Sequence, residues 1–249
     1  MTLLPTELSK IVTNLDNEKM LWYGEPGVGK STTANQDGTL FLATDPGHSK
    51  MNCFKVEIDS WNKFGQVYKE LHEGKHKFKR ICIDTVSVLH LLCSRAKCER
   101  LGIEHESDLD WGKGWSIVNK AFEKAIQGLS LLNVGVIFID HEQTKEISEK
   151  TGKLRRQQPG MNEKASRIVC GYVDHIMRFA IEDDPEVAGK EKRIIQVEPS
   201  KYYISKSRGD RGVSIFSKNM DMSWAAIKAE YDEGIAKLLK TTQTKMEAK

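Results

Sequence analysis

A glycine-rich segment near the N-terminus has the residue types and spacing that bind phosphate. Residues 24–31 read Gly-Glu-Pro-Gly-Val-Gly-Lys-Ser and match the eight-residue phosphate-binding pattern. The glycines let backbone N–H groups turn inward around a β-phosphate, and the Lys30 ammonium reaches the β- and γ-phosphate oxygens. The Ser31 hydroxyl is an oxygen ligand for Mg²⁺. We therefore expect a nucleotide-binding loop made by Gly24, Glu25, Pro26, Gly27, Val28, Gly29, Lys30, Ser31 and Thr32.

A carboxylate at the end of a second apolar run completes the expected metal site. Asp84 follows the run at residues 81–83. Ligands of open α/β sheets bind beyond the carboxyl ends of the strands, so Asp84 is expected to hold Mg²⁺ through water beside the phosphates. The alternative role for Asp84 is to cap a helix that starts at Val86.

Two more polar residues follow strand-length apolar runs. Asp45 comes after residues 40–43, and His141 comes after residues 134–139. A carboxylate at this edge can orient or deprotonate the attacking water, and we assign this role to Asp45. A polar group after the later strand can contact the γ-phosphate, and we assign this role to His141. The alternatives are a turn at Asp45-Pro46-Gly47 and a histidine that only ends the sheet.

The elements that must position these groups follow from hydrophobic periodicity. Strand-length apolar runs alternate with helical patterns, which predicts an α/β fold with a mostly parallel sheet flanked by helices. An alternating pattern on both sides of a turn predicts an antiparallel hairpin that extends the sheet, and Ser223 can cap a final helix that ends near Lys240. We expect Trp111 and Trp115 to pack on the sheet rather than to stack on nucleic-acid bases. The predicted strands are residues 20–23, 40–43, 81–83 and 134–139, the hairpin strands are 177–181 and 195–197, and the helices are 60–73, 86–101 and 115–132.

Length and composition limit the class of protein. The chain has 249 residues, of which 39% are hydrophobic, and we expect a single domain over residues 1–240 with a frayed tail at 241–249. The longest strongly apolar stretch, residues 131–139, is much shorter than the ~18 residues that a membrane span needs, so we expect no membrane partner. The five cysteines mostly lie in apolar runs, which is typical of buried free thiols in a reducing compartment.

Taken together, these segments resemble a known family. Residues 24–32, 41–45, 81–85 and 137–142, the Trp-Gly-Lys-Gly-Trp block at 111–115 and Lys206-Ser207-Arg208 are similar to the phage-encoded RecA-like P-loop ATPases of the single-strand annealing (Sak-type) class. The resemblance implies a RecA-like core that binds ATP and Mg²⁺, binds single-stranded DNA and acts in phage recombination. It also implies the cytoplasm of a bacterial host, and a single-stranded-DNA-binding protein as a possible partner. The family commonly has Glu where Asp45 stands, so the shorter side chain is expected to slow hydrolysis.

The resemblance assigns roles to two basic regions. Lys206 and Arg208 resemble the paired basic finger that ring and filament ATPases insert into a neighbouring subunit's nucleotide site, which implies a homo-oligomer. In isolation they would be an ordinary solvated pair. In RecA-like proteins the segment after the sensor strand faces DNA, and here residues 144–167 form a long loop or a loosely formed hairpin, expected to be mobile, that leads into a short helix. The expected phosphate contacts are Lys145, Lys150, Lys153, Arg155, Arg156, Lys164 and Arg167.

The charge distribution agrees with these assignments. The whole chain has a net charge of only +3. Residues 144–167 carry +4 and residues 201–211 carry +3, so the rest of the chain is net negative. Positive charge is thus concentrated in two regions: the one expected to bind DNA and the one expected to enter the nucleotide site of a neighbouring subunit.

We therefore expect an ATP-dependent, oligomeric single-stranded-DNA-binding protein that promotes annealing or strand pairing. One alternative is a small-molecule or nucleotide kinase, with residues 144–167 as a lid over the phosphates. Another is a DNA-binding module that uses ATP only to assemble and does not hydrolyse it.

Overall fold

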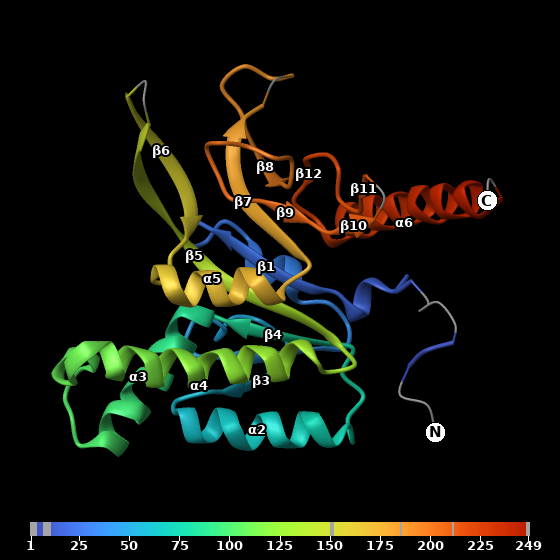
Figure 1. The fold of residues 1–249 in the computed structure, drawn as a ribbon. Helices are drawn as coiled ribbons and strands as arrows, with labels where there is room; N and C mark the ends of the chain where they lie inside the picture. The colour runs from blue at the N-terminus through green and yellow to red at the C-terminus, as the bar shows by residue number, and fades with distance from the viewer. Residues whose placement is uncertain (1–3, 7–10, 150–151, 185, 211, 248–249) are drawn as a thin grey trace.

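The central strand of the sheet is β1 (Lys19–Gly24), whose six residues are all buried. It pairs in parallel with β5 (Gly135–Glu149) on one side and with β7 (His175–Asp183) on the other. The computed structural model describes residues 4–6, 11–149, 152–184, 186–210 and 212–247. Within these residues the strand order is β12-β8-β7-β1-β5-β4-β2-β3 (Figure 1). The other strands in this order are β2 (Thr39–Ala43), β3 (Phe54–Glu57), β4 (Arg80–Asp84), β8 (Glu191–Gln196) and β12 (Met220–Asp221).

Pairing is parallel from β7 through β3, and β8 and β12 add an antiparallel ribbon at one edge. The strand β5 lies between β1 and β4, so the phosphate-loop strand and the Asp84 strand are not direct neighbours. This arrangement confirms the predicted α/β fold class: a mostly parallel sheet flanked by helices and extended by an antiparallel hairpin.

Helices cover both faces of the sheet (Figure 1). Because side chains alternate along a strand, Leu21 and Tyr23 of β1 join one hydrophobic cluster and Met20 and Trp22 join the other. The first cluster packs against four helices and the second against two. The four are α2 (Trp61–Glu73), α3 (Val86–Leu101), α4 (Lys113–Ser130) and α5 (Glu163–Tyr172), and the two are α1 (Lys30–Ala34) and α6 (Trp224–Glu247).

The remaining elements are short or peripheral. Strand β6 pairs antiparallel with β5, β9 pairs with β7, and β10 and β11 form a separate small ribbon. Their bounds, with those of the 3-10 turns, are β6 (Gly152–Pro159), β9 (Lys206–Ser207), β10 (Gly209–Asp210), β11 (Val213–Ser214), η1 (Leu15–Asn17), η2 (Glu106–Asp108) and η3 (Asp110–Gly112).

The helix boundaries follow local capping chemistry. Ser60 Oγ accepts a hydrogen bond from Lys63 N at the start of α2, and Ser223 Oγ accepts one from Ala226 N at the start of α6. Gly102 ends α3 in the left-handed conformation, with φ of 66°. These three boundaries confirm the sequence prediction.

The structure differs from the sequence prediction, or decides between its alternatives, in three segments. Strand β3 was not predicted, because its four residues lie at the sheet edge and are mostly exposed. For residues 144–167, where a long loop and a loosely formed hairpin were both open, the structure has a regular hairpin of β5 and β6, followed by the expected short helix, α5. Helix α6 continues to Glu247, where a frayed tail was expected from residue 241.

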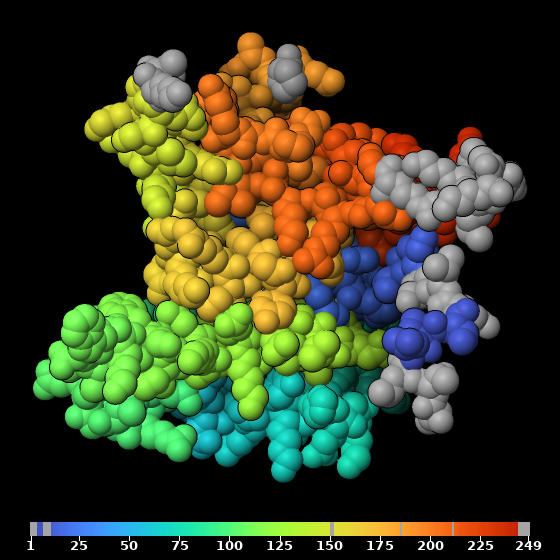
Figure 2. Space-filling view, viewed as in Figure 1, coloured from blue at the N-terminus to red at the C-terminus, as the bar shows by residue number. Residues whose placement is uncertain are grey.

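The hairpin of β5 and β6, which we call the arm, extends beyond the body of the protein (Figure 2). The first six residues of β5 are buried in the sheet and most of its remaining residues are exposed. The ladder runs from Glu142 opposite Pro159 to Glu149 opposite Gly152. The arm is therefore a continuation of a core strand rather than a separate insertion.

The two tryptophans of the Gly-Lys-Gly block do not pack on the sheet as predicted. Trp111 is 100% exposed, and Trp115 contacts the His105 ring at a centroid distance of 5.4 Å. Trp111 also has φ of 57°, which is rare for a non-glycine residue. The backbone of the turn between α3 and α4 directs this side chain into solvent.

All five cysteines are free, and Cys82, Cys93 and Cys98 are buried. No helix within the described parts of the chain has the length and apolar character needed to cross a membrane.

A buried carboxylate joins the amino end of the sheet to α6. His175 Nε2 lies 3.2 Å from Glu18 Oε2, and the Tyr231 hydroxyl donates to Glu18 Oε1 at 2.7 Å. Burial raises the pKa of Glu18, but the hydrogen bonds from His175 and Tyr231 outweigh burial and hold it below its usual value. A lowered pKa means that the ionised carboxylate stabilises the fold at neutral pH, and that this stabilisation is lost as the pH falls through the folded-state pKa.

We predict that Tyr231→Phe lowers the free energy of unfolding by about 1–3 kcal/mol, because one oxygen of a buried carboxylate loses its donor. The loss is expected to be smaller in acid, where Glu18 is protonated. Urea denaturation at neutral and acidic pH measures both values. Tyr202→Phe, at an exposed position, is the control, and an equal effect of the two variants would contradict the prediction.

Candidate nucleotide site

The phosphate loop leaves the sheet at the end of β1 and enters α1. A β-carbon at residue 24 would lie 2.2 Å from the carbonyl oxygen of Phe179 on β7, so only glycine fits where the loop starts. Gly27 and Gly29 have φ of 76° and 122°, which other residues rarely adopt. Thr33 N then donates to Gly29 O at 2.9 Å and begins α1. The predicted strand, loop and helix are thus present in the order that phosphate binding requires.

Lys30 is buried and folds back over the loop that precedes it. Its ammonium donates to the carbonyl oxygens of Gly24 and Glu25, at 2.8 Å each. Burial lowers the pKa of Lys30, and nearby carboxylates, first Asp84, oppose this shift. The Lys30 ammonium is therefore held at the loop. A bound phosphate group can replace the two carbonyl oxygens as its hydrogen-bond acceptor.

Ser31 and Asp84 meet as the metal assignment requires. Ser31 Oγ donates to Asp84 Oδ2 at 2.5 Å, and Asp84 is buried at the end of β4. A hydroxyl and a carboxylate are hard oxygen donors, which Mg²⁺ prefers, and Mg²⁺ sites are commonly completed by substrate phosphates and water. These two residues would hold the ion, which would neutralise charge on the phosphates.

His48 is a residue of this site that the sequence analysis did not identify. It is buried, and its Nε2 lies 3.0 Å from Asp84 Oδ2, the oxygen that also accepts from Ser31. The hydrogen bond to Asp84 opposes the effect of burial and raises the pKa of His48. His48 follows the turn after β2, and the pairing of Ala43 with Asp84 brings that turn beside the metal site.

The chain after β2 also positions Asp45. Thr44 N donates to Asp84 O at 2.9 Å, and Thr85 N donates to Thr44 Oγ1 at 2.7 Å, which joins the ends of β2 and β4. Asp45 is half-buried and its Oδ1 accepts from Gly47 N at 3.2 Å. The residue therefore forms the expected turn and also lines the nucleotide cavity.

The cavity at this edge has a volume of about 450 Å³. Lys30, Ser31, Asp45, Asp84 and His141, the predicted residues at the strand ends, all line it, together with Gly27, Gly29, Thr32, Gly47, His48 and Met51. His141 reaches the cavity because its register position on β5 is opposite Gly24. The structure thus brings together the loop, the metal pair and both candidate catalytic side chains.

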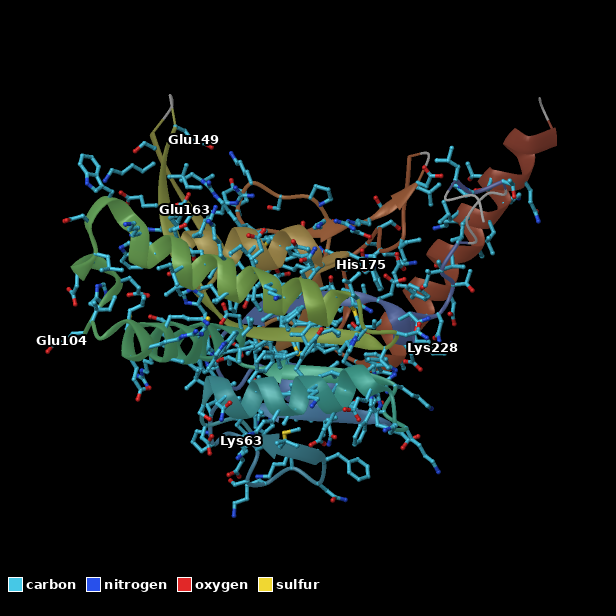
Figure 3. All side chains as sticks on the ribbon, turned by 60° about the horizontal axis from the view of Figure 1, so that its bottom comes forward. Lys63, Glu104, Glu149, Glu163, His175 and Lys228 are labelled. Carbon is cyan, nitrogen blue, oxygen red and sulfur yellow. The ribbon has the colours of Figure 1, made fainter. Side chains whose placement is uncertain are left out.

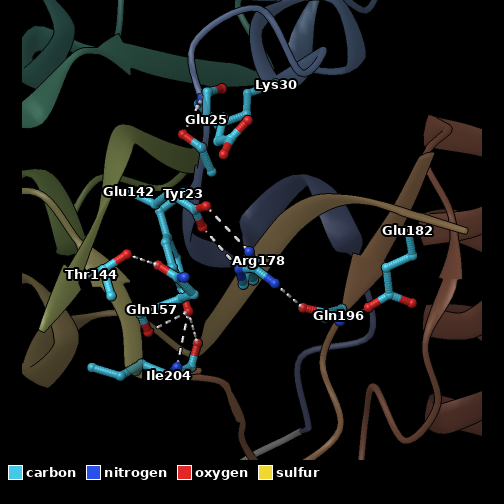
Figure 4. A network of polar contacts seen from close by, with 11 residues as sticks. Tyr23, Glu25, Lys30, Glu142, Thr144, Gln157, Arg178, Glu182, Gln196 and Ile204 are labelled. Atoms are coloured by element: carbon cyan, nitrogen blue, oxygen red, sulfur yellow. Dashed lines mark hydrogen bonds and ion pairs between the residues drawn. The ribbon is translucent and has the colours of Figure 1, made fainter. Parts of the chain in front are cut away.

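Next to this cavity, a polar network joins the arm to the sheet at Glu142, the first residue of the arm ladder, which we call the root of the arm (Figure 4). Arg178 of β7 contacts both carboxylate oxygens of Glu142, at 2.8 and 3.2 Å, and donates to Gln196 Oε1 at 2.8 Å. The Tyr23 hydroxyl donates to Ile204 O at 2.6 Å. Sequence reasoning missed this network, since an isolated Arg on a strand carries no signal of its partner.

Lys206 and Arg208 lie away from this cavity. Lys206 is paired with Ile176 near the start of β7, whereas the phosphate loop follows the end of β1, which is opposite Phe179. The Lys206 ammonium donates to the carbonyls of Cys170 and Val173 at the end of α5, at 2.8 and 2.6 Å. Arg208 donates to Asp174 Oδ1 and Gly171 O, at 3.1 Å each. Neither cation reaches the nucleotide site of its own chain.

The predicted DNA-contacting residues lie on the arm and on α5. Lys145, Lys153, Arg155 and Arg156 are on the arm, Lys164 and Arg167 are on α5, and Lys150 lies outside the described residues. Glu146 forms an ion pair with Lys153 at 2.5 Å, and Glu163 forms one with Arg167 at 2.5 Å and one with Lys145 at 3.5 Å. Part of the positive charge is therefore neutralised within the chain.

The fold and the site define a P-loop nucleotide-binding ATPase. The model of a family described as "AAA domain" matches residues 16–209, so the chain belongs to this family. The family implies nucleotide binding, typically with Mg²⁺. Among solved structures, a KaiC-like protein from the hyperthermophilic archaeon Pyrococcus horikoshii OT3 is similar, with 14% identity, a TM-score of 0.42, and coverage of 72% of this chain and 77% of that chain. No curated protein matches the chain.

We predict that Lys30→Ala abolishes measurable binding of Mg-ATP, because the loop loses the cation that neutralises the β- and γ-phosphates. Titration calorimetry with ATP, in the presence and absence of Mg²⁺, measures the loss. Lys69→Ala, at an exposed position on α2, is the control and should bind as the wild type does. Lys30→Ala with an affinity within twofold of wild type would contradict the assignment.

Proposed function

We propose that the protein is an ATP-dependent, single-stranded-DNA-binding recombination protein that promotes annealing or strand pairing. In this proposal Mg-ATP binds at the phosphate loop, Asp45 orients or deprotonates the attacking water, and His141 contacts the γ-phosphate. The arm and the adjacent helix α5 bind DNA. The resemblance to the Sak-type phage ATPases supports the same function.

The observation that carries the proposal is a pair of like charges on the arm. Lys145 is directly opposite Arg156 across the ladder, and the next pair on that face is Ile147 with Leu154. Like charges directly opposite each other destabilise a hairpin. The ion pair of Lys145 with Glu163 is long, at 3.5 Å, and solvent-exposed, so it offsets little of this repulsion. A polyanion reverses the sign of this interaction, because two adjacent cations then neutralise adjacent phosphates.

The polar network supplies a physical route from nucleotide to DNA. His141 lines the nucleotide cavity, Glu142 is bound by Arg178, and Lys145 lies three residues further along the same strand. A shift of His141 on binding or loss of the γ-phosphate is therefore applied directly to the root of the arm. This supports coupling of the nucleotide state to DNA binding.

The exposed tryptophan supports contact with bases as well as with phosphates. The paired residues of the arm that the structure describes, 142–149 and 152–159, contain no Phe, Tyr or Trp. Trp111, in the turn between α3 and α4, offers a fully exposed indole for stacking. In Figure 3, Glu104 of this turn lies on the same side of the molecule as Glu149 near the arm tip, and Lys228 of α6 lies on the other side.

The proposal includes a homo-oligomer. Lys206 and Arg208 lie far from the site of their own chain, and the Arg208 side chain is 55% exposed. In this proposal the half-exposed guanidinium exchanges Asp174 and Gly171 for the nucleotide site of a neighbouring copy, where it would stabilise charge on the transferring phosphoryl group.

The function is tested by measuring ATP hydrolysis and oligonucleotide annealing with and without single-stranded DNA at low salt. We expect DNA to stimulate hydrolysis and ATP to stimulate annealing. Hydrolysis that DNA leaves unchanged would overturn the coupling. Full annealing with a non-hydrolysable ATP analogue would favour the assembly-only module, and phosphoryl transfer to an added nucleoside monophosphate would favour a kinase.

We predict that Lys145→Gln combined with Arg156→Gln weakens binding to oligo(dT) and makes the salt dependence shallower. Loss of two phosphate contacts on a single strand should reduce the slope of log affinity against log salt by about 1.4. Fluorescence anisotropy over a salt series measures it. The combination of Lys69→Gln and Lys124→Gln, on exposed helix positions, keeps the same net charge as the arm variant, and an equal effect of the two pairs would contradict a specific role of the arm.

We also predict that Asp45→Asn lowers kcat by about 10²-fold or more while ATP binding changes little, since the amide cannot accept a proton from water. Asp45→Glu is expected to raise kcat above wild type, because the longer side chain moves the carboxylate toward the cavity. Steady-state hydrolysis with separately measured ATP affinity checks both. If Asp45→Asn hydrolyses ATP at the wild-type rate, the residue acts only in the turn with Gly47.

A further inference from the structure

An arginine beside the phosphate loop has no assigned role. Arg193 is exposed on β8, and its side chain has no ion-pair or hydrogen-bond partner among the residues that the structure describes. Other cations of the same two strands differ in this respect. Lys192 of β8 binds Asp221 at 2.7 Å, and Arg178 of β7 binds Glu142.

Strand register places Arg193 level with the phosphate loop along the strand direction, just beyond the carboxyl end of β1. The last residue of β1, Gly24, pairs with Phe179 of β7, and Ile181 of β7 pairs with Arg193. Arg193 therefore lies two residues, or about 7 Å, beyond the end of β1. This is the level at which the chain turns from β1 into the loop.

The side chain also lies on the correct face of the sheet. Arg193 and Ile195 are two residues apart on β8 and share a face. Ile195 belongs to the hydrophobic cluster that includes Val28 of the loop and Ala34 of α1. Arg193 thus projects on the same face as the loop and its helix.

The guanidinium reaches the loop itself. A β-carbon on Gly29 would lie 3.7 Å from Arg193 Nη1 and 3.1 Å from Met222 Sδ. Met222 N donates to Arg193 O at 3.2 Å, which fixes β8 against the chain after β12. Side chains from two segments of the edge ribbon therefore lie beside the loop at the glycine that precedes Lys30.

We propose that Arg193 is a phosphate-binding residue of the nucleotide site, supplied by the same chain and directed at the β-phosphate. The inference rests on nucleotide binding at the phosphate loop. A guanidinium presents parallel N–H donors that match two phosphate oxygens, and Arg193 has no partner to give up within the described chain. Strand pairing already fixes its backbone, so only side-chain freedom is lost on binding. Arg193 differs in this from Lys206 and Arg208, which face away from their own site.

The test compares Arg193→Gln, Arg193→Lys and Lys192→Gln by calorimetric titration with ATP, ADP and inorganic pyrophosphate, each with Mg²⁺. Arg193→Gln is expected to weaken all three ligands by about tenfold or more, the loss expected for one charge-assisted hydrogen bond. Arg193→Lys should retain part of the affinity as a point charge. Lys192→Gln, which removes the adjacent paired cation, should bind as the wild type does.

Two results would overturn the inference. One is wild-type affinity of Arg193→Gln for ADP and pyrophosphate. The other is a loss for ADP with none for pyrophosphate, which would place the contact on the sugar or base. Thermal unfolding without nucleotide should give the same Tm for Arg193→Gln and wild type. If wild type itself binds none of the three ligands, nucleotide binding fails and not only the role of Arg193.

Discussion

The parallel pairing of β1 between β5 and β7 determines where the functional groups lie. Because the strands point the same way, their carboxyl ends meet at one edge, and each register pair fixes a neighbour of the loop. Gly24 is opposite His141 on one side and Phe179 on the other. Phe179 approaches so closely that the loop must begin with glycine. A shift of β7 or β5 by one residue would displace both the loop and the residues that serve it.

The nucleotide site was largely predictable from the sequence because its signals are local. The loop pattern contains the glycines that its backbone needs, and Asp84 ends a strand whose apolar run is unambiguous. The parallel fold then brings separate strand ends together, so the position of Asp45 and His141 in one cavity followed without knowledge of the sheet order. His48 was missed because its contact with Asp84 depends on the path of the turn after β2, which no local pattern specifies.

Elements without a buried face were not predictable in the same way. Strand β3 is exposed and its sequence shows no clean alternation, so it was not predicted. For the arm, the sequence left a loop and a loose hairpin open, and backbone pairing with a neighbour decides between them. For Trp111 the prediction was wrong in the other direction, because burial was expected and the side chain is exposed. Its hydrophobicity favours burial, but a left-handed backbone at residue 111 turns the side chain outward. Lys206 and Arg208 could be recognised as a basic pair, while their contacts with the end of α5 depend on long-range packing.

The continuity of β5 gives the arm a mechanical property that a flexible loop lacks. The strand carries His141 at the cavity and then extends eight residues further to Glu149, or about 26 Å at the usual rise of a strand. Glu142, the first residue after His141, is held by the bidentate contact with Arg178 and is mostly buried, so the ion pair is only weakly screened by solvent. The arm is therefore fixed at its root, and most of its described outer residues are exposed. A small rotation of the strand at His141 becomes a larger displacement at Lys145 and Arg156, and an even larger one further out. Because the Glu142 contact resists independent motion of the root, the arm and the nucleotide cavity are expected to move as one unit rather than separately.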